Sequence, residues 1–199
     1  MEFQEVIRRR RMVRDYQDRA LPPGALARML TNATRAPSAG FTQGCAFLAL
    51  EGHEQTEVFW SHTFDAEGRA TFAHQGLFNA PALVLALASK QAYLDRYASA
   101  DKARTGLAEE SGWPVPYWDT DAAFAAMLLL LTAVDAGLGA LFFGIFRGED
   151  ELLAALGVPS GYRPIGAIAL GYPAVGDGPA PSPAKRRRRL EEIVHRGRW

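Results

Sequence analysis

The chain has 199 residues, of which 48% are hydrophobic and 22% charged, and its formal net charge at pH 7 is zero. This composition is typical of a folded globular protein and excludes a disordered or fibrous chain. The lack of a net positive charge argues against nucleic acid or an anionic membrane as a partner. The basic residues are unevenly placed, because 19 of the 22 are arginine and two basic runs stand out, at 8–11 and 185–189.

The first half of the chain is predicted to hold two helices followed by a strand, a helix and a strand. Residues 2–11 have apolar residues at helical spacing and no apolar core of a secretory signal. A second helix begins at Pro22 and ends before Pro37, because the residue that precedes a proline avoids the helical region. The next elements are a buried strand over 45–50, a helix over 53–63 and a buried strand over 82–88.

Cys45, the only cysteine, lies in the first of these strands. A single cysteine cannot form an intrachain disulfide, which fits a reducing compartment, and we expect a cytoplasmic protein. No histidine or lysine nearby in the sequence would activate the thiol, so a structural role is favoured over a catalytic one.

The second half begins with a polar stretch, 90–118, that ends in GWPVPYW. Asp121 is then expected to cap the N-terminus of a long apolar helix that runs to about Ala136 and ends at Gly137. The remaining elements are a strand over 139–145, a short helix over 149–156, a strand over 165–170 and a C-terminal extension over 179–199, which consists of a proline-rich linker and a basic tail.

The apolar stretch 122–146 is long enough to resemble a membrane span. Asp135 near its middle would cost about 2.5–3.5 kcal/mol on insertion scales, so a buried helix followed by a buried strand is the favoured interpretation. A helix that is apolar on every side must be covered on every side. We therefore expect a second subunit to supply part of the cover.

Strands alternate with helices along the chain, which favours an α/β or α+β sheet covered by helices. The strands are continuously apolar, which predicts a sheet buried on both faces. No repeat or domain boundary is visible, so residues 1–199 are predicted to form one domain.

Several common site signatures are absent from the sequence. There is no Walker phosphate loop, no GxGxxG dinucleotide fingerprint and no GxSxG nucleophile elbow. The four histidines are scattered without metal-ligand spacing. The sequence therefore predicts chemistry that uses neither a metal nor a covalent nucleophile.

Arginine is the residue type that remains. In RRRRMVR (8–14), Arg10 and Arg14 are placed to converge on one anion, and guanidinium binds phosphate in a bidentate fork. A solvated basic face and a nucleic-acid contact stay open as alternatives, although aromatic interleaving is absent around the basic runs. The small-residue turn PSAGFTQ (37–43) suits a planar ligand, but turns of this kind are common.

Five segments together resemble the nitroreductase family in order and spacing. They are RRMVRDY (10–16), ATRAPSAGFTQ (33–43), DAAFAAMLLLLTAVDAGLGALFFG (121–144), GVPSGYRPIGAIALGYP (157–173) and RRRRLEEIVHRGRW (186–199). The resemblance spans essentially the whole chain. It implies an α+β fold with a mixed, mainly antiparallel central sheet flanked by helices, in an intertwined homodimer with FMN at the subunit interface.

The resemblance also implies a reaction in which NAD(P)H gives hydride to flavin N5 and leaves. A small electron-poor acceptor, such as a nitroaromatic or a quinone, then takes the electrons in the same pocket, and the cofactor carries the chemistry. The alternatives are specialised chemistry on the same fold and flavin (reductive dehalogenation, ene reduction or flavin destruction), or a flavin-binding or nucleic-acid-binding protein without turnover.

The phosphate ligands that the resemblance implies are Arg10, Lys185 and Arg187. Met12 replaces the family's usual serine, so one hydroxyl contact is lost, and Arg11 is the candidate to compensate for it.

Other family positions match residues around the flavin rings. Arg14 matches a basic group near the ribityl chain and pyrimidine, and the backbone N–H groups of Phe143 and Gly144 match those that face N5 and O4. The turn that would meet the isoalloxazine edge from the partner subunit is Pro37, Ser38, Ala39 and Gly40. Phe41 departs from the usual asparagine of this turn, and no lysine in 73–79 matches the one that many members place near N1.

Residues 93–118 match the family's substrate lid. Its aromatic residues are candidates to stack on a flat acceptor, and the alternative is that they only pack the lid onto the body. They are Tyr93, Tyr97, Trp113, Tyr117 and Trp118.

Overall fold

The computed structural model describes residues 1–177 and 187–199. Its centre is a sheet of four strands in the order β1-β2-β4-β3, with each neighbouring pair antiparallel. The strands are β1 (Cys45–Glu51), β2 (Ala82–Ala88), β3 (Gly139–Phe143) and β4 (Arg163–Gly171). The α+β class is confirmed. The mixed character expected of the sheet is limited, in the part of the chain that the structure describes, to an isolated parallel bridge between Met12 and Ala140.

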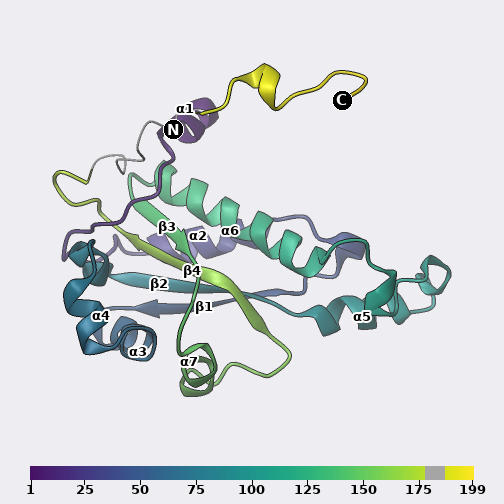
Figure 1. Cartoon of the computed structure of the whole chain (residues 1–199), viewed down its shortest axis with the longest axis horizontal. Helices are drawn as coiled ribbons and strands as arrows, with labels where there is room; N and C mark the ends of the chain where they lie inside the picture. Colours follow the sequence, from purple (N-terminus) through teal and green to yellow (C-terminus); the bar gives the residue numbers. More distant parts are fainter. Residues whose placement is uncertain (178–186) are drawn as a thin grey trace.

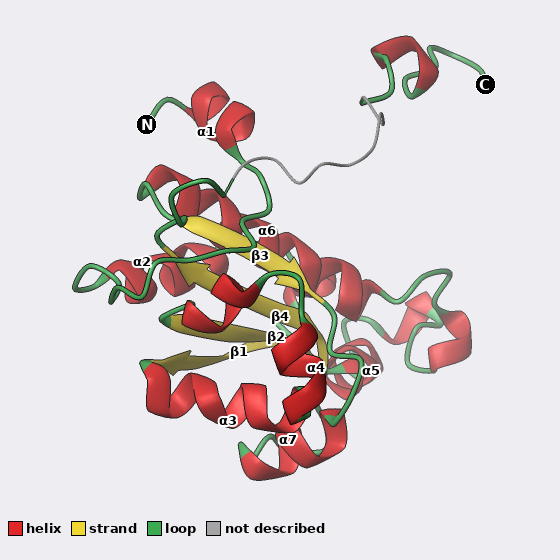
Figure 2. Cartoon of the chain, turned by 60° about the vertical axis from the view of Figure 1, so that its left-hand side comes forward, coloured by secondary structure: helices red, strands yellow, loops and turns green. Residues whose placement is uncertain are grey.

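Helices cover both faces of this sheet (Figures 1 and 2). On one face lie α2 (Ala25–Ala33) and α6 (Tyr117–Asp135), and on the other lie α3 (His53–Thr63), α4 (Ala66–Thr71) and α7 (Glu149–Ala155). The helices α1 (Phe3–Arg9) and α5 (Lys90–Ala98) lie at the two ends of the molecule (Figure 1).

Each face has its own hydrophobic core, because successive side chains of a strand point to opposite faces. Val84 packs with Met29 of α2 and Leu129 of α6, whereas its neighbour Leu83 packs with Phe59 of α3. The predicted burial on both faces is confirmed for β2, whose residues are all buried. The edge strand β1 is mostly half-buried in the single chain.

The long helix α6 begins earlier than predicted. It starts at Tyr117, so Asp121 lies inside the helix and is not its N-cap. Its end is as predicted: Gly137 adopts a φ of 74°, and the N–H of Leu138 bonds back to the carbonyl of Ala133, the Schellman arrangement.

By composition α6 is long and apolar enough to cross a membrane, but 56% of its most apolar stretch is buried inside this chain. Its remaining face is uncovered in the single chain, where Phe124 is 48% and Met127 44% exposed. The helix therefore serves the core on one side and leaves an apolar strip on the other.

Two helices and one strand end differ from the predicted elements. The helices α4 and α5 were not predicted, and β3 stops at Phe143 rather than at Ile145. The proline-rich linker 179–183 lies outside the described residues. The tail 187–199 is mostly exposed and stands apart from the body (Figure 1).

Candidate functional site

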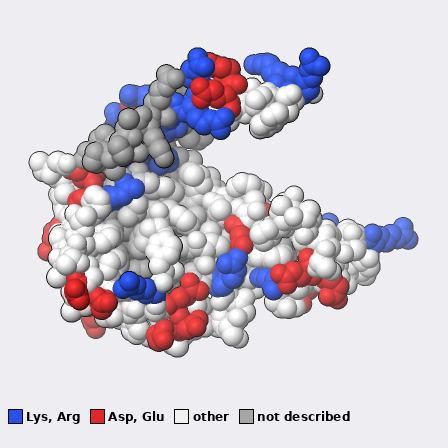
Figure 3. All heavy atoms as spheres, viewed as in Figure 1, with Lys and Arg blue, Asp and Glu red and all other residues white. Residues whose placement is uncertain are grey.

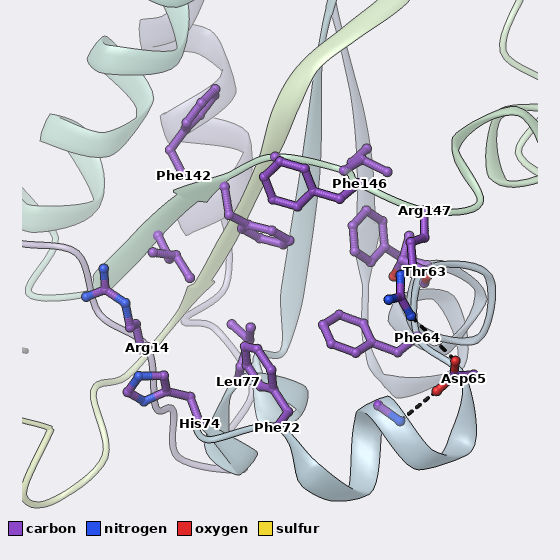
Figure 4. Close-up of a pocket in the computed structure, with 16 residues that line it drawn as sticks. Arg14, Thr63, Phe64, Asp65, Phe72, His74, Leu77, Phe142, Phe146 and Arg147 are labelled. Carbon is purple, nitrogen blue, oxygen red and sulfur yellow. Dashed lines mark hydrogen bonds and ion pairs between the residues drawn. The ribbon is translucent and has the colours of Figure 1, made fainter.

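A cavity of about 540 Å³ opens at the end of β3. We call it the first cavity. Its lining comes from the extended segment after α1, from α3 and the stretch between α3 and β2, and from β3 with the loop that follows it. Figure 4 shows Arg14 and His74 side by side on one side of the cavity, and Asp65 with Arg147 on the other.

The position of Arg14 follows from the extended backbone of its segment. The N–H of Val13 donates to the carbonyl of Ala140 in β3 at 3.0 Å, and the side chain of Val13 is buried there. Side chains alternate along an extended chain, so Arg14 points to the other side. Its guanidinium makes one long contact, 3.5 Å to the carbonyl of Met12, and no ion pair with a carboxylate within the described residues.

Arg11 is engaged elsewhere, which differs from its expected role. It forms an ion pair with Asp177, whose Oδ1 also accepts the backbone N–H groups of Arg14 and Asp15, both at 3.1 Å. Burial alone would raise the pKa of Asp177, but these hydrogen bonds outweigh it and lower that pKa. The geometry therefore does not favour Arg11 as the group that compensates for Met12.

Arg10 and Arg187, two of the expected phosphate ligands, do not line the first cavity in the single chain. Arg10 directly follows α1 and is half-buried outside the cavity lining. Arg187 is exposed on the tail, whose basic groups stand apart from the largely uncharged face of the body (Figure 3). Lys185 lies outside the described residues.

His74 is a candidate that sequence reasoning missed. Its Nδ1 lies 2.9 Å from Oδ2 of Asp15, and its side chain is 37% exposed in the first cavity. The sequence was inspected over 73–79 for a lysine near flavin N1, and its histidines were inspected for metal-ligand spacing. Neither criterion selects a single histidine. Asp15, directly after Arg14, was the available signal.

Aromatic rings make the rest of the cavity apolar. Phe143 stacks on Trp60 with ring centroids 6.0 Å apart, and Phe64 meets Phe72 edge-on at 5.2 Å. Phe146, in the loop after β3, is 91% exposed. A cavity with apolar walls and a few cationic donors suits a flat ligand that carries an electron-rich or anionic edge.

The small-residue turn lies at a different cavity. Pro37 and Ser38 line a second cavity of about 500 Å³ together with Cys45 and Asp121. The turn is strained, since Phe41 and Gln43 adopt φ values of 54° and 53°, which are uncommon without glycine. The Phe41 side chain is held out in solvent, with the residue 77% exposed.

Asp121 holds this turn in place. The residue is 5% exposed, and its Oδ2 accepts the N–H of Ala39 at 2.8 Å and the hydroxyl of Tyr93 at 2.7 Å. Burial, together with this hydrogen bond, raises the pKa of Tyr93. The Nε of Arg96 also donates to the carbonyl of Gly40 at 3.0 Å. The turn is therefore hydrogen-bonded to α5 through Arg96 and to α6 through Asp121.

The five aromatic residues of the expected lid do not line the first cavity. Tyr93, Tyr97 and Trp118 are buried, and Trp113 meets Tyr97 edge-on with centroids 4.7 Å apart. Tyr117 is 38% exposed. In the single chain their contacts are those of the packing alternative, and a stacking role toward an acceptor stays a prediction.

Other catalytic chemistries have little support in the described residues. Burial raises the pKa of the Cys45 thiol, which fits a structural cysteine. In residues 1–177 and 187–199, no group of three or more histidine, cysteine, aspartate or glutamate side chains is placed to hold a metal ion.

Comparison with known proteins gives consistent matches. The model of the nitroreductase family matches residues 7–172. A protein of Archaeoglobus fulgidus, whose name proposes an NADH dehydrogenase/NAD(P)H nitroreductase, is 28% identical over 175 residues, which cover 86% of each chain.

Solved structures share the fold. A proposed nitroreductase from Desulfovibrio desulfuricans in complex with FMN aligns with a TM-score of 0.71 at 24% identity, over 98% of this chain and 95% of that one. A nitroreductase-like protein from Streptococcus mutans aligns with a TM-score of 0.75 at 19% identity, over 98% and 97%.

Proposed function

Because this chain belongs to the nitroreductase family of oxidoreductases, we propose that it binds FMN as a homodimer and passes electrons from NAD(P)H to a small electron-poor acceptor, such as a nitroaromatic or a quinone. The observation that carries the proposal is the first cavity, where the guanidinium of Arg14, which pairs with no carboxylate in residues 1–177 and 187–199, lies beside His74 against aromatic walls. The family resemblance, the name of the Archaeoglobus relative and the FMN of the Desulfovibrio structure support it.

The residues of the first cavity fit a flavin. A flavin is flat and apolar over its rings, and its pyrimidine end accepts hydrogen bonds. Arg14 supplies donors that no carboxylate of the described residues occupies, and the rings of Phe64, Phe72 and Phe143 supply the apolar walls. The bound flavin would supply the redox chemistry, while the protein orients it and excludes water.

The phosphate is assigned to three basic residues, Arg10, Lys185 and Arg187. Arg10 follows α1 on the same extended segment as Arg14, at a spacing that puts both on one side of the chain. Lys185 and Arg187 remain part of the proposal as ligands that the C-terminal extension would bring to the phosphate.

The dimer enters the proposal because one chain holds the site in two separate pieces. The turn at Pro37–Gly40 lies at the second cavity, so a second subunit would have to present its own turn to the first cavity. The exposed strip of α6 at Phe124 and Met127 is the kind of surface that an obligate interface covers.

Two measurements test this proposal. The purified protein should be yellow and should release FMN, not FAD, on denaturation. Co-expression of Arg14→Ala and Gly40→Val subunits, each inactive alone when FMN is limiting, should restore about a quarter of wild-type NAD(P)H oxidation, because half of the random dimers are hybrids with one intact site. A colourless protein that ignores added FMN refutes the cofactor, and an active flavin-loaded monomer refutes the dimer.

The specialised chemistries remain the second candidate for the reaction. They are distinguished by NAD(P)H oxidation measured with and without a nitroaromatic or a quinone. Acceleration by either acceptor supports the proposal, and a flavin that NAD(P)H reduces but neither acceptor reoxidises would replace it with a specialised reaction.

A further inference from the structure

His74 and Asp15 form a buttressed pair in the wall of the first cavity. Oδ2 of Asp15 lies 2.9 Å from Nδ1 of His74, and Oδ1 of Asp15 accepts the N–H of Gly76 at 3.0 Å. An aspartate fixed in this way keeps a proton on Nδ1 and leaves Nε2 as the nitrogen that can gain or lose one. The pair therefore has the arrangement of a group that binds and releases a proton.

The charges around this pair leave Arg14 as its main charged neighbour in the cavity. Asp177 bonds to the backbone N–H of Asp15, but its charge is matched by its ion pair with Arg11. The other two charged groups that line the cavity, Asp65 and Arg147, lie 3.6 Å apart and pair with each other, and Glu57 of α3 pairs with Arg69 of α4 at 2.5 Å.

We infer that His74 takes up one proton on Nε2 when the ligand in this cavity gains negative charge, and releases it when the electrons leave. The inference rests on the proposed function. NAD(P)H delivers a hydride, which is two electrons and one proton, so the cavity gains one negative charge that a solvent proton on Nε2 balances. A quinone that then accepts the hydride needs one further proton to become a hydroquinone, and Nε2–H supplies it.

Electrostatics explains why uptake and release follow the electrons. The cavity is walled by aromatic rings, so charges within it interact more strongly than they would in water. With a neutral ligand, Asp15 attracts a proton to His74 and Arg14 repels it. With an anionic ligand, the charge on His74 is balanced by the ligand and supported by Asp15. The side chain of His74 is 37% exposed, so the proton exchanges with solvent.

The test is a redox titration of the FMN-loaded protein against pH. From about pH 7 to 8, above the usual pKa of histidine, the equilibrium constant for two-electron reduction should change about 100-fold per pH unit in the wild type and about 10-fold in His74→Gln, since one bound proton is lost. The difference of tenfold per pH unit corresponds to about 30 mV for a two-electron couple.

Two further variants make the result specific. Asp15→Asn keeps an acceptor for the N–H of Gly76 but removes the charge that supports the protonated ring, so its dependence should also fall to about tenfold per pH unit. His53→Gln is the control, because His53 also pairs with an aspartate, through Nε2 to Asp18 at 2.9 Å, but on the surface and outside the cavity. It should titrate as the wild type does.

Each outcome decides the matter. A wild-type dependence equal to that of His74→Gln, whether tenfold or 100-fold, overturns the inference and leaves the proposed function intact. If His74→Gln fails to fold or to bind FMN, the comparison of Asp15→Asn with wild type decides in the same way. A wild-type protein that binds no FMN overturns the proposed function itself.

Discussion

The polar groups of the first cavity and those of the turn at 37–41 differ in whether the protein itself supplies their hydrogen-bond partners. At the turn, Asp121 accepts two hydrogen bonds inside the protein, and Arg96 donates to the carbonyl of Gly40. In the cavity, Arg14 has no carboxylate partner in the described residues, and His74 pairs through only one ring nitrogen. One region is completed by its own chain, and the other keeps donors available for a ligand.

This difference separates stability from ligand binding. Removing one partner of a buried hydrogen bond lowers the free energy of unfolding most, because the remaining donors or acceptors are left unsatisfied. Removing a group that faces a cavity changes the free energy of unfolding little, but it removes a contact with the ligand and so lowers affinity. Substitutions in the turn region should therefore lower the free energy of unfolding, and substitutions in the cavity should lower affinity while leaving stability nearly unchanged.

The largest expected effect is that of Asp121→Ala. It leaves the N–H of Ala39 and the hydroxyl of Tyr93 without their acceptor, which should lower the free energy of unfolding by about 2–5 kcal/mol in urea titrations. Asp119→Ala is the control on the same helix. Asp119 pairs with Arg163 near the surface and should cost about 1 kcal/mol or less. Equal losses would show that the turn does not depend on Asp121.

Next is the effect of Arg14→Ala on flavin binding. Loss of a charged donor should weaken FMN binding by about 1.5–3 kcal/mol in fluorescence titrations, with little change in unfolding. Arg28→Ala removes an exposed arginine of α2 that lines neither of the two cavities, and it should leave affinity unchanged. A loss of stability as large as the loss of affinity would remove the contrast between the two regions.

A smaller effect distinguishes packing from stacking in the expected lid. The indole N–H of Trp113 donates to the carbonyl of Leu107 at 2.8 Å. Trp113→Phe keeps an aromatic ring but loses this bond, which should cost about 0.5–1.5 kcal/mol of stability. If the packing alternative holds, KM for a nitroaromatic acceptor stays the same. A changed KM at unchanged stability would instead support a lid that touches the acceptor.

The fold was predictable where the pattern was local. The range of β2 was predicted because a continuous apolar run lies between Pro81 and Ser89, and α3 was predicted over its full length. The start of α6 was misjudged because Asp121 is a residue type that caps helices, whereas here it is buried inside one. The helix α5 was missed because two buried tyrosines, Tyr93 and Tyr97, carry its apolar face within a polar stretch.

The site was predictable only in part, for the same reason. Alternation along an extended segment separated Arg14 from its neighbours, and this is a local property. The pair of His74 with Asp15 joins residues 59 positions apart, and the pair of Arg11 with Asp177 joins residues 166 positions apart. No local sequence pattern predicts such pairs, because they depend on how the fold brings distant segments of the chain together.

The smallest expected effect concerns Asp177, which holds the segment that carries Arg14. Asp177→Asn keeps an acceptor for the N–H groups of Arg14 and Asp15 but loses the charge opposite Arg11. The cost should be about 1 kcal/mol or less, because the Arg11 side chain is 34% exposed and solvent weakens the pair. Because folding lowers the pKa of Asp177 below its usual value of 3.8, the ionised carboxylate contributes stability above that value. The contribution is lost as the pH falls through the pKa of the folded state.

The advantage of the wild type over Asp177→Asn should therefore be constant from neutral pH down to the usual value of 3.8 and should shrink below it. Thermal unfolding of both proteins across this range measures it. Asp18→Asn, at an exposed aspartate beside His53, provides the comparison for a carboxylate outside the segment. An advantage that persisted unchanged in acid would mean that the shape of the side chain, and not its charge, holds Arg14 toward the cavity. Packing would then hold the first cavity in place, just as hydrogen bonds hold the turn in place. The two regions would differ only in that the cavity is open to a ligand and the turn is not.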